Sequence, residues 1–228
     1  MLYTTSIQMC EKIALFDFCE TLVNFQTADA FVRYAYKNIN NKELSCSNLV
    51  DGLLSFLDGI TGYRFSLHKR YLLRNLRGVS ADQIAECACS YYNTIVKRNF
   101  IPEMLNVLRK CLSEGFSIVL ISGGYDVYLK LFADEFHLKT IIATKIQYKN
   151  NICTGRIDGK DCLAHNKVAL LNKLYNRNDI YAVAYSDSIT DKPLLEWANI
   201  GYVISKNNSQ VWARDYNFKE IIWEEKSN

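Results

Sequence analysis

Three aspartates with an ordered spacing carry the clearest chemistry in this sequence. Asp17 lies at the end of the apolar segment 12–18, and Asp187 and Asp191 follow the apolar segment 180–185. Carboxylates gathered at one site repel one another unless a cation holds them together. A hard divalent ion with oxygen ligands resolves that repulsion, and the predicted cofactor is Mg²⁺.

Hydrogen-bond donors for an anion accompany these acids. Ser122, Gly123 and Gly124 follow a second apolar run, and Lys167 opens a later helical segment. A hydroxyl, two backbone N–H groups and an amine can together hold a phosphate. Taken alone, an aspartate after a strand is more often a turn or cap residue than a nucleophile, and Ser122-Gly123-Gly124 or Lys167 can be a plain turn or a surface lysine. Their ordered co-occurrence with the carboxylates favours phosphoryl transfer.

The elements that must position these residues alternate along the chain. Strands are expected at 12–18, 116–121, 140–144, 180–185 and 201–204, with a small hairpin over 145–157. Helices are expected at 102–114, 125–135, 166–175 and 191–198. Alternation of this kind predicts an α/β fold with a Rossmann-like doubly wound parallel sheet. The carboxyl ends of parallel strands share one rim, so the acids and the donors should meet there.

A long helical block separates the first two strands. Residues 25–99 show no clear strand, and Ser80 with Gln83 forms a capping box before a helix that ends near residue 98. We therefore expect an inserted all-helical cap domain over 25–99. The core domain would comprise residues 1–24 and 100–228.

Four segments, in order, resemble the motifs of the haloacid dehalogenase superfamily. Residues 17–22 are similar to its Asp-x-Asp-x-Thr motif, 120–124 to its serine after an apolar strand, and 185–191 to its pair of aspartates. Lys167 fits the remaining motif. The helical block after the first motif makes the resemblance strongest to the phosphoserine-phosphatase-like branch.

The resemblance implies a role for each residue. Asp17 would attack phosphorus and become an aspartyl phosphate. Ser122 and the backbone of Gly123 and Gly124 would hold phosphoryl oxygens, and Lys167 would neutralise charge. The predicted metal-site residues are Asp17, Cys19 through its carbonyl, Asp187 and Asp191. Of these, Asp191 would act on magnesium waters or on Lys167.

Cys19 departs from the pattern, because the family places a second aspartate there. That aspartate protonates the leaving alcohol and then activates water. A thiol remains protonated at neutral pH, so it could donate a proton but would be a poor base. Three interpretations stay open: a phosphatase that compensates, a slow phosphatase or phosphotransferase, or a weakened binding or regulatory protein. Glu20 also departs, since glycine is common there.

The substrate is expected to be a small phosphorylated metabolite, such as a sugar, polyol or amino-acid phosphate, for example in cell-surface glycan biosynthesis. A cap over the rim would enclose a molecule of that size. Arg64 is the predicted substrate-binding residue of the cap. The basic stretch 64–77 is either a solvated helix face or faces an anion. The wider set of specificity candidates comprises Phe25, Asp29, Arg33, Tyr63, Arg64, His68 and Arg70.

Composition narrows the class of protein. The net charge is only +3 over 228 residues, and the basic residues are too dispersed to form a stripe. This disfavours nucleic acid as a partner. No apolar run is long enough to insert into a membrane. The eight cysteines form no Cys-x-x-Cys pair and follow no signal peptide, which predicts reduced thiols in a cytoplasmic protein. A zinc site at Cys87 and Cys89 is poorly supported, and homo-oligomerisation is left open.

Overall fold

A seven-stranded sheet forms the centre of the part of the chain that the computed structural model describes, residues 11–44, 48–61 and 66–225. The strand order is β4-β3-β2-β1-β5-β6-β7, and all neighbours are parallel except β3 and β4. The strands are β1 Glu11–Phe16, β2 Ser117–Tyr125, β3 Thr140–Lys149, β4 Ile152–Asp158, β5 Ile180–Ser186, β6 Ile200–Lys206 and β7 Lys219–Trp223. The predicted α/β class with a mostly parallel sheet is confirmed.

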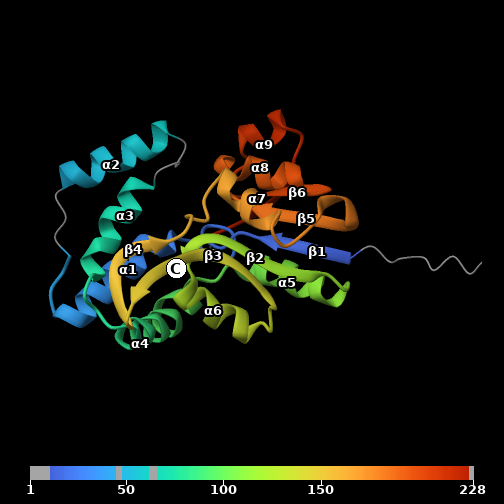
Figure 1. Ribbon diagram of the computed structural model, residues 1–228. Helices are drawn as coiled ribbons and strands as arrows, with labels where there is room; N and C mark the ends of the chain where they lie inside the picture. Colours follow the sequence, from blue (N-terminus) through green and yellow to red (C-terminus); the bar gives the residue numbers. More distant parts are fainter. Residues whose placement is uncertain (1–10, 45–47, 62–65, 226–228) are drawn as a thin grey trace, which may run out of the picture.

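Helices cover both faces of the sheet (Figure 1). Helices α5 Pro102–Ser113 and α6 Asp126–Glu135 lie on one face, and α7 His165–Leu171, α8 Lys192–Trp197 and α9 Val211–Asp215 lie on the other. Strand β1 shows the result: Ile13 and Leu15 pack into one hydrophobic cluster, and Ala14 and Phe16 into the other. Burial of such a side chain stabilises the fold by roughly 1.5–3 kcal/mol. A central strand buried on both faces is therefore a continuous apolar run.

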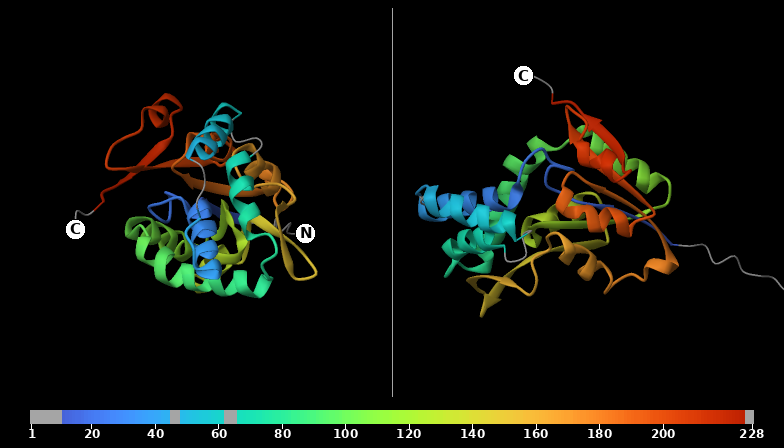
Figure 2. Two further views of the ribbon diagram at one scale, coloured as in Figure 1. Left: turned by 90° about the vertical axis from the view of Figure 1, so that its left-hand side faces the viewer. Right: turned by 90° about the horizontal axis from the view of Figure 1, so that it is seen from above.

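In the described part of the chain, the helices between β1 and β2 other than α5 lie beyond one end of the sheet, as Figures 1 and 2 show. They are α1 Thr27–Asn40, α2 Asn48–Ile60, α3 Leu67–Leu73 and α4 Ala81–Tyr91. The predicted capping box is present, because the Ser80 hydroxyl accepts from the Gln83 amide and the Gln83 side chain accepts from the Ser80 amide. Helical turns continue from α4 to residue 99. The division into a 25–99 cap and a core of 1–24 and 100–228 stays a prediction.

Three details of the fold differ from, or refine, the sequence-based elements. The segment Ser122-Gly123-Gly124 lies within β2, whose pairing with β3 shifts register there, and is not a turn beyond the strand. The hairpin is confirmed, with Asn150 and Asn151 in the left-handed region at φ 51° and 63°. Strand β7 was not expected, because its charged residues and single buried side chain leave little apolar pattern.

No helix in the described residues is long and apolar enough to cross a bilayer.

Candidate active site

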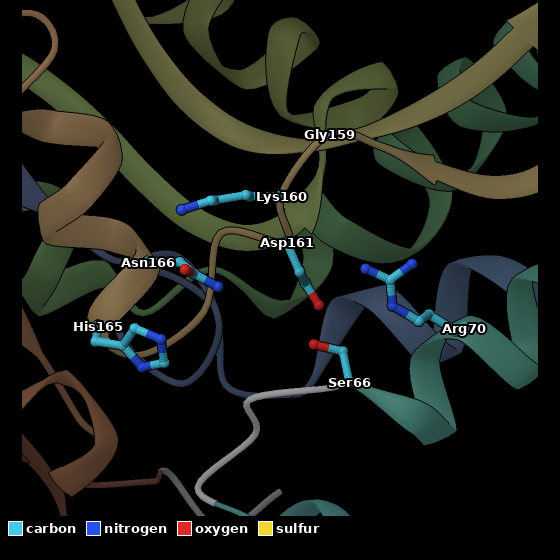
Figure 3. A pocket seen from close by; sticks show the side chains of 7 residues that line it. All are labelled: Ser66, Arg70, Gly159, Lys160, Asp161, His165 and Asn166. Atoms are coloured by element: carbon cyan, nitrogen blue, oxygen red, sulfur yellow. The ribbon is translucent and has the colours of Figure 1, made fainter.

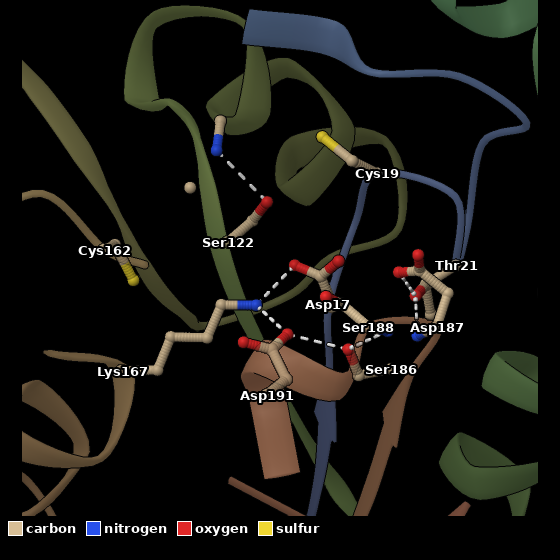
Figure 4. Close-up of polar contacts among 12 residues, drawn as sticks. Asp17, Cys19, Thr21, Ser122, Cys162, Lys167, Ser186, Asp187, Ser188 and Asp191 are labelled. Carbon is tan, nitrogen blue, oxygen red and sulfur yellow. Dashed lines mark hydrogen bonds and ion pairs between the residues drawn. The ribbon is translucent and has the colours of Figure 1, made fainter. Parts of the chain in front are cut away.

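Asp17, Lys167 and Asp191 form a buried cluster at the carboxyl end of the sheet (Figure 4). Asp17 directly follows β1, Lys167 lies in α7, and Asp191 precedes α8. The Lys167 amine donates to Asp17 Oδ1 at 2.7 Å and to Asp191 Oδ2 at 2.5 Å. Burial lowers the pKa of Lys167, but the two carboxylates outweigh it and raise that pKa. Lys167 is therefore a permanent cation beside Asp17. The Ser186 hydroxyl donates to Asp191 Oδ2 at 2.7 Å and so helps to fix the second carboxylate that contacts Lys167.

Asp187 lies outside the reach of that lysine. Its Oδ1 accepts from the Thr21 hydroxyl at 3.1 Å, and its backbone N–H donates to the same hydroxyl. Burial, the charge of Asp17 and the charge of Glu20 raise the pKa of Asp187 well above its usual value. Burial also raises the pKa of Asp17, against the opposing effect of Lys167. One lysine thus leaves excess negative charge here, which a bound cation would stabilise.

The donor segment lies on the neighbouring strand. Phe16 of β1 pairs with Leu120 of β2, so the residues that follow each of them meet at the same rim. The Ser122 hydroxyl is buried and accepts from the Gly124 amide at 3.2 Å. A Cβ at Gly123 would lie 2.4 Å from Leu163 Cδ2, and one at Gly124 would lie 2.7 Å from the Tyr128 hydroxyl. A larger residue at either position would therefore require the neighbouring side chains to move.

Cys19 is held by the first turn of α1. Its sulfur lies 3.0 Å from the Thr27 hydroxyl and accepts from the Thr27 amide at 3.5 Å. The Thr27 hydroxyl is also hydrogen-bonded to the Tyr128 hydroxyl, at 2.7 Å. Desolvation of the sulfur, reinforced by the charge of Asp17, raises the pKa of the Cys19 thiol to about 11. The side chain is thus a fixed, protonated thiol. Next to it, Glu20 has φ 54°, which explains why glycine suits that position.

The sequence profile of the haloacid dehalogenase-like hydrolase family matches residues 14–196, which include this whole cluster. The chain belongs to this family. A phosphoserine phosphatase of Methanocaldococcus jannaschii is 24% identical over 220 residues, covering 93% of this chain and 96% of that protein. A phosphoserine phosphatase of a Polaromonas species is 24% identical over 196 residues, covering 83% and 77%.

Solved structures agree on the fold. A Bordetella pertussis protein of unknown function superposes with a TM-score of 0.74 at 21% identity, covering 92% of this chain and 98% of that one. A substrate-bound phosphoserine phosphatase superposes with a TM-score of 0.61 at 19% identity, covering 92% of both chains. The predicted haloacid dehalogenase-like family and its broad enzyme class, a phosphatase-type hydrolase, are confirmed. The individual residue roles stay predictions.

The donor set of this haloacid dehalogenase-like hydrolase suits Mg²⁺. The described residues contain no group of three or more His, Cys, Asp or Glu side chains able to hold a metal ion by themselves. Mg²⁺ typically uses one or two protein carboxylates and completes its shell with waters and substrate phosphate. Asp17, Asp187 and the Cys19 carbonyl fit that requirement. The zinc alternative gains no support, because Cys87 and Cys89 belong to no such group in the described residues.

Several predicted specificity residues are engaged within the helical insertion. His68 Nδ1 lies 3.1 Å from Asp29, and Arg33 donates to Asp51 at 3.0 Å, so these side chains join α1, α2 and α3. Phe25 packs against the hydrophobic core. Arg64 and Tyr63, predicted for substrate binding and specificity, lie outside the described residues.

Arg70 lies in a cavity of about 310 Å³ between α3 and the segment that leads into α7 (Figure 3). Lys160, His165 and Asn166 line its other side, and Asn166 directly precedes Lys167. The sequence singled out Arg70 but not Lys160 or His165, because a loop lysine and a lone histidine give no periodic signal. The lining also includes Asp161, whose charge is paired with Lys69. Arg70 and Lys160 therefore add positive charge to a cavity next to the carboxylate cluster.

Proposed function

We propose that this chain is a Mg²⁺-dependent phosphatase that transfers the phosphoryl group of a small phosphomonoester to Asp17 and then to water. The supporting observation is the buried Asp17, whose Oδ1 is held 2.7 Å from the Lys167 amine at the rim that also carries Ser122. Lys167 opposes the burial that raises the pKa of Asp17, and the ionised carboxylate is the form that can attack phosphorus.

In the first step Asp17 Oδ2 forms a bond to phosphorus while the bond from phosphorus to the ester oxygen breaks. Lys167, the Ser122 hydroxyl and the Gly123 and Gly124 amides stabilise the phosphoryl oxygens. The leaving oxygen takes the proton of the Cys19 thiol, which then regains one from solvent. When bound by Asp17, Asp187 and the Cys19 carbonyl, Mg²⁺ would neutralise the excess carboxylate charge and polarise the phosphoryl group.

In the second step water attacks the phosphorus of the aspartyl phosphate, releasing phosphate and restoring Asp17. The neutral Cys19 thiol gives this water little help as a base. The aspartyl phosphate should therefore be long-lived, and the second candidate function, phosphoryl transfer to an alcohol in place of water, rests on that same thiol.

The proposed substrate is a phosphomonoester that carries a carboxylate, such as a phosphorylated amino or hydroxy acid. Arg70 and Lys160 line the cavity that adjoins Lys167, and these two cationic groups would attract a second anionic group. Two relatives named phosphoserine phosphatase support the same class. Sugar and polyol phosphates, which have no carboxylate, would leave this cavity unused.

The test is phosphate release from a panel of phosphorylated amino acids, hydroxy acids, sugars and polyols, with Mg²⁺ and with excess chelator. We expect release that needs Mg²⁺, favours the acids and is abolished by Asp17→Asn. Asp134→Asn, an exposed aspartate on α6, controls for the chemical change itself. Release by Asp17→Asn at the unmodified rate would exclude the nucleophile, and a preference for neutral polyol phosphates would exclude the substrate class.

A further inference from the structure

Lys69 is a buried lysine that connects α3 to the donor segment of β2. Its amine donates to the Gly123 carbonyl, to the Thr144 hydroxyl at 2.9 Å and to Asp161 Oδ1 at 2.6 Å. The amine also lies 5.0 Å from the centre of the Tyr125 ring. The side chains of Lys69 and Asp161 are 8% and 3% exposed. The contacts join residues that are far apart in the chain, and none of them belongs to the cluster around Asp17.

A buried ion pair is expensive to desolvate, so its placement calls for a structural reason. The charges here are balanced: burial raises the pKa of Asp161, but Lys69 and the neighbouring hydroxyls outweigh it and hold the pKa below its usual value. The start of α3 is fixed as well, because Asp58 accepts from the Leu67 and His68 amides at 2.7 and 2.8 Å. Lys69 is therefore presented to the sheet from an anchored helix.

The orientation of one peptide unit follows from these contacts. The Gly123 carbonyl and the Gly124 N–H belong to the same peptide, which is trans, so they point in opposite directions. Lys69 donates to the carbonyl and holds it on the side of Asp161. The Thr144 hydroxyl lies 3.1 Å from the same carbonyl and 2.5 Å from Asp161 Oδ1, its nearer acceptor. The Gly124 N–H must then point the other way, and it donates to the Ser122 hydroxyl at 3.2 Å.

We infer that Lys69 is a positioning residue that fixes the Gly123–Gly124 peptide so that its N–H faces the phosphoryl group. That this N–H binds a phosphoryl group rests on the proposed function. The orientation of the peptide does not, because it follows from the hydrogen bonds of Gly123 and Gly124. Glycines without side-chain packing would otherwise let this peptide rotate easily. Through Lys69 the helical insertion therefore sets the geometry of the phosphate-binding backbone without touching the substrate.

The experiment compares Lys69→Met with the double variant Lys69→Met/Asp161→Asn, which removes the charge left unpaired. Lys37→Met removes an exposed lysine from α1 and serves as the matched control. Amide exchange of Gly124 is followed by NMR in ¹⁵N-glycine-labelled protein. Affinity for inorganic phosphate is measured by calorimetry with Mg²⁺, and thermal unfolding reports stability.

Lys69→Met should accelerate Gly124 exchange and weaken phosphate binding by about 10-fold or more each, the effect of losing one hydrogen bond to a charged group. The double variant should regain stability but neither of these properties. A folded double variant with the exchange rate and phosphate affinity of Lys37→Met would overturn the inference. If the unmodified protein binds no phosphate while Gly124 exchange still responds to Lys69→Met, the proposed function fails and the positioning of the peptide stands.

Discussion

Replacing Cys19 with aspartate should convert a slow second step into a fast one. In the structure the Cys19 sulfur sits where a carboxylate could accept from the Thr27 amide and hydroxyl, the groups that now contact the sulfur at 3.5 and 3.0 Å. The substitution therefore needs no rearrangement of α1. It adds a base near the phosphoryl group that Asp17 is proposed to carry.

The size of the effect follows from the protonation state of the thiol. With a pKa of about 11, Cys19 is a thiolate in about one molecule in 10⁴ at pH 7. Loss of a general base typically costs about 10²–10⁴ in rate. The unmodified protein should therefore release the alcohol in a burst of about one equivalent and then turn over slowly. Cys19→Asp should abolish the burst and raise steady-state turnover by about 10²-fold.

Rapid-quench measurement of alcohol and phosphate separately distinguishes the two steps. Cys19→Ser is the matched control, because a hydroxyl keeps the size and the Thr27 contacts but is no better a base. We expect it to retain the burst. Turnover by Cys19→Asp no faster than by Cys19→Ser, together with no burst in the unmodified protein, would refute the reasoning about position 19.

Three further predictions concern stability and pH. Lys167→Met leaves two buried carboxylates uncompensated, so it should destabilise the fold by about 3–5 kcal/mol and abolish turnover, measured by urea unfolding and phosphate release. Gly123→Ala should cost about 1–3 kcal/mol, because its Cβ would lie 2.4 Å from Leu163 Cδ2. Gly52→Ala, in open helical space, should instead stabilise by about 0.5–1 kcal/mol, and equal effects at the two glycines would contradict this. The hydrogen bond to Asp29 raises the pKa of His68 in the folded protein above its value in the unfolded chain, despite burial. The ion pair therefore stabilises the fold fully at pH values below the unfolded-state pKa of His68, and this stabilisation is lost as the pH rises through the folded-state pKa. The melting-temperature gap between the unmodified protein and His68→Gln should accordingly shrink from pH 5.5 to pH 8.5, and a constant gap would exclude this.

The sequence was most informative where buried strands end in polar residues. The apolar runs before Asp17 and before Asp187 predicted parallel strands, and parallel strands necessarily bring their carboxyl ends together. Lys167 was placed correctly beside Asp17 for the same reason, since it opens the helix that precedes β5. These inferences depend on local pattern and chirality alone, which a single sequence carries.

The buried pair of Lys69 and Asp161 could not be predicted in this way. Lys69 lies in a basic stretch for which both a solvated face and an anion-facing role were open, and its partner is a loop residue 92 positions away. Burial of such a lysine depends on how the helical insertion meets the sheet. The Thr27–Tyr128 contact that extends from Cys19 is likewise a product of packing between α1 and α6.

The most direct test of the central claim is the covalent intermediate on Asp17. Protein mixed with Mg²⁺ and a turned-over phosphorylated acid is quenched in acid and analysed by intact and peptide mass spectrometry. We predict a mass increase of one phosphoryl group, located on Asp17 and absent from Asp17→Asn. Turnover with no phosphorylated protein at any quench time, or a phosphoryl group on another residue, would contradict the account.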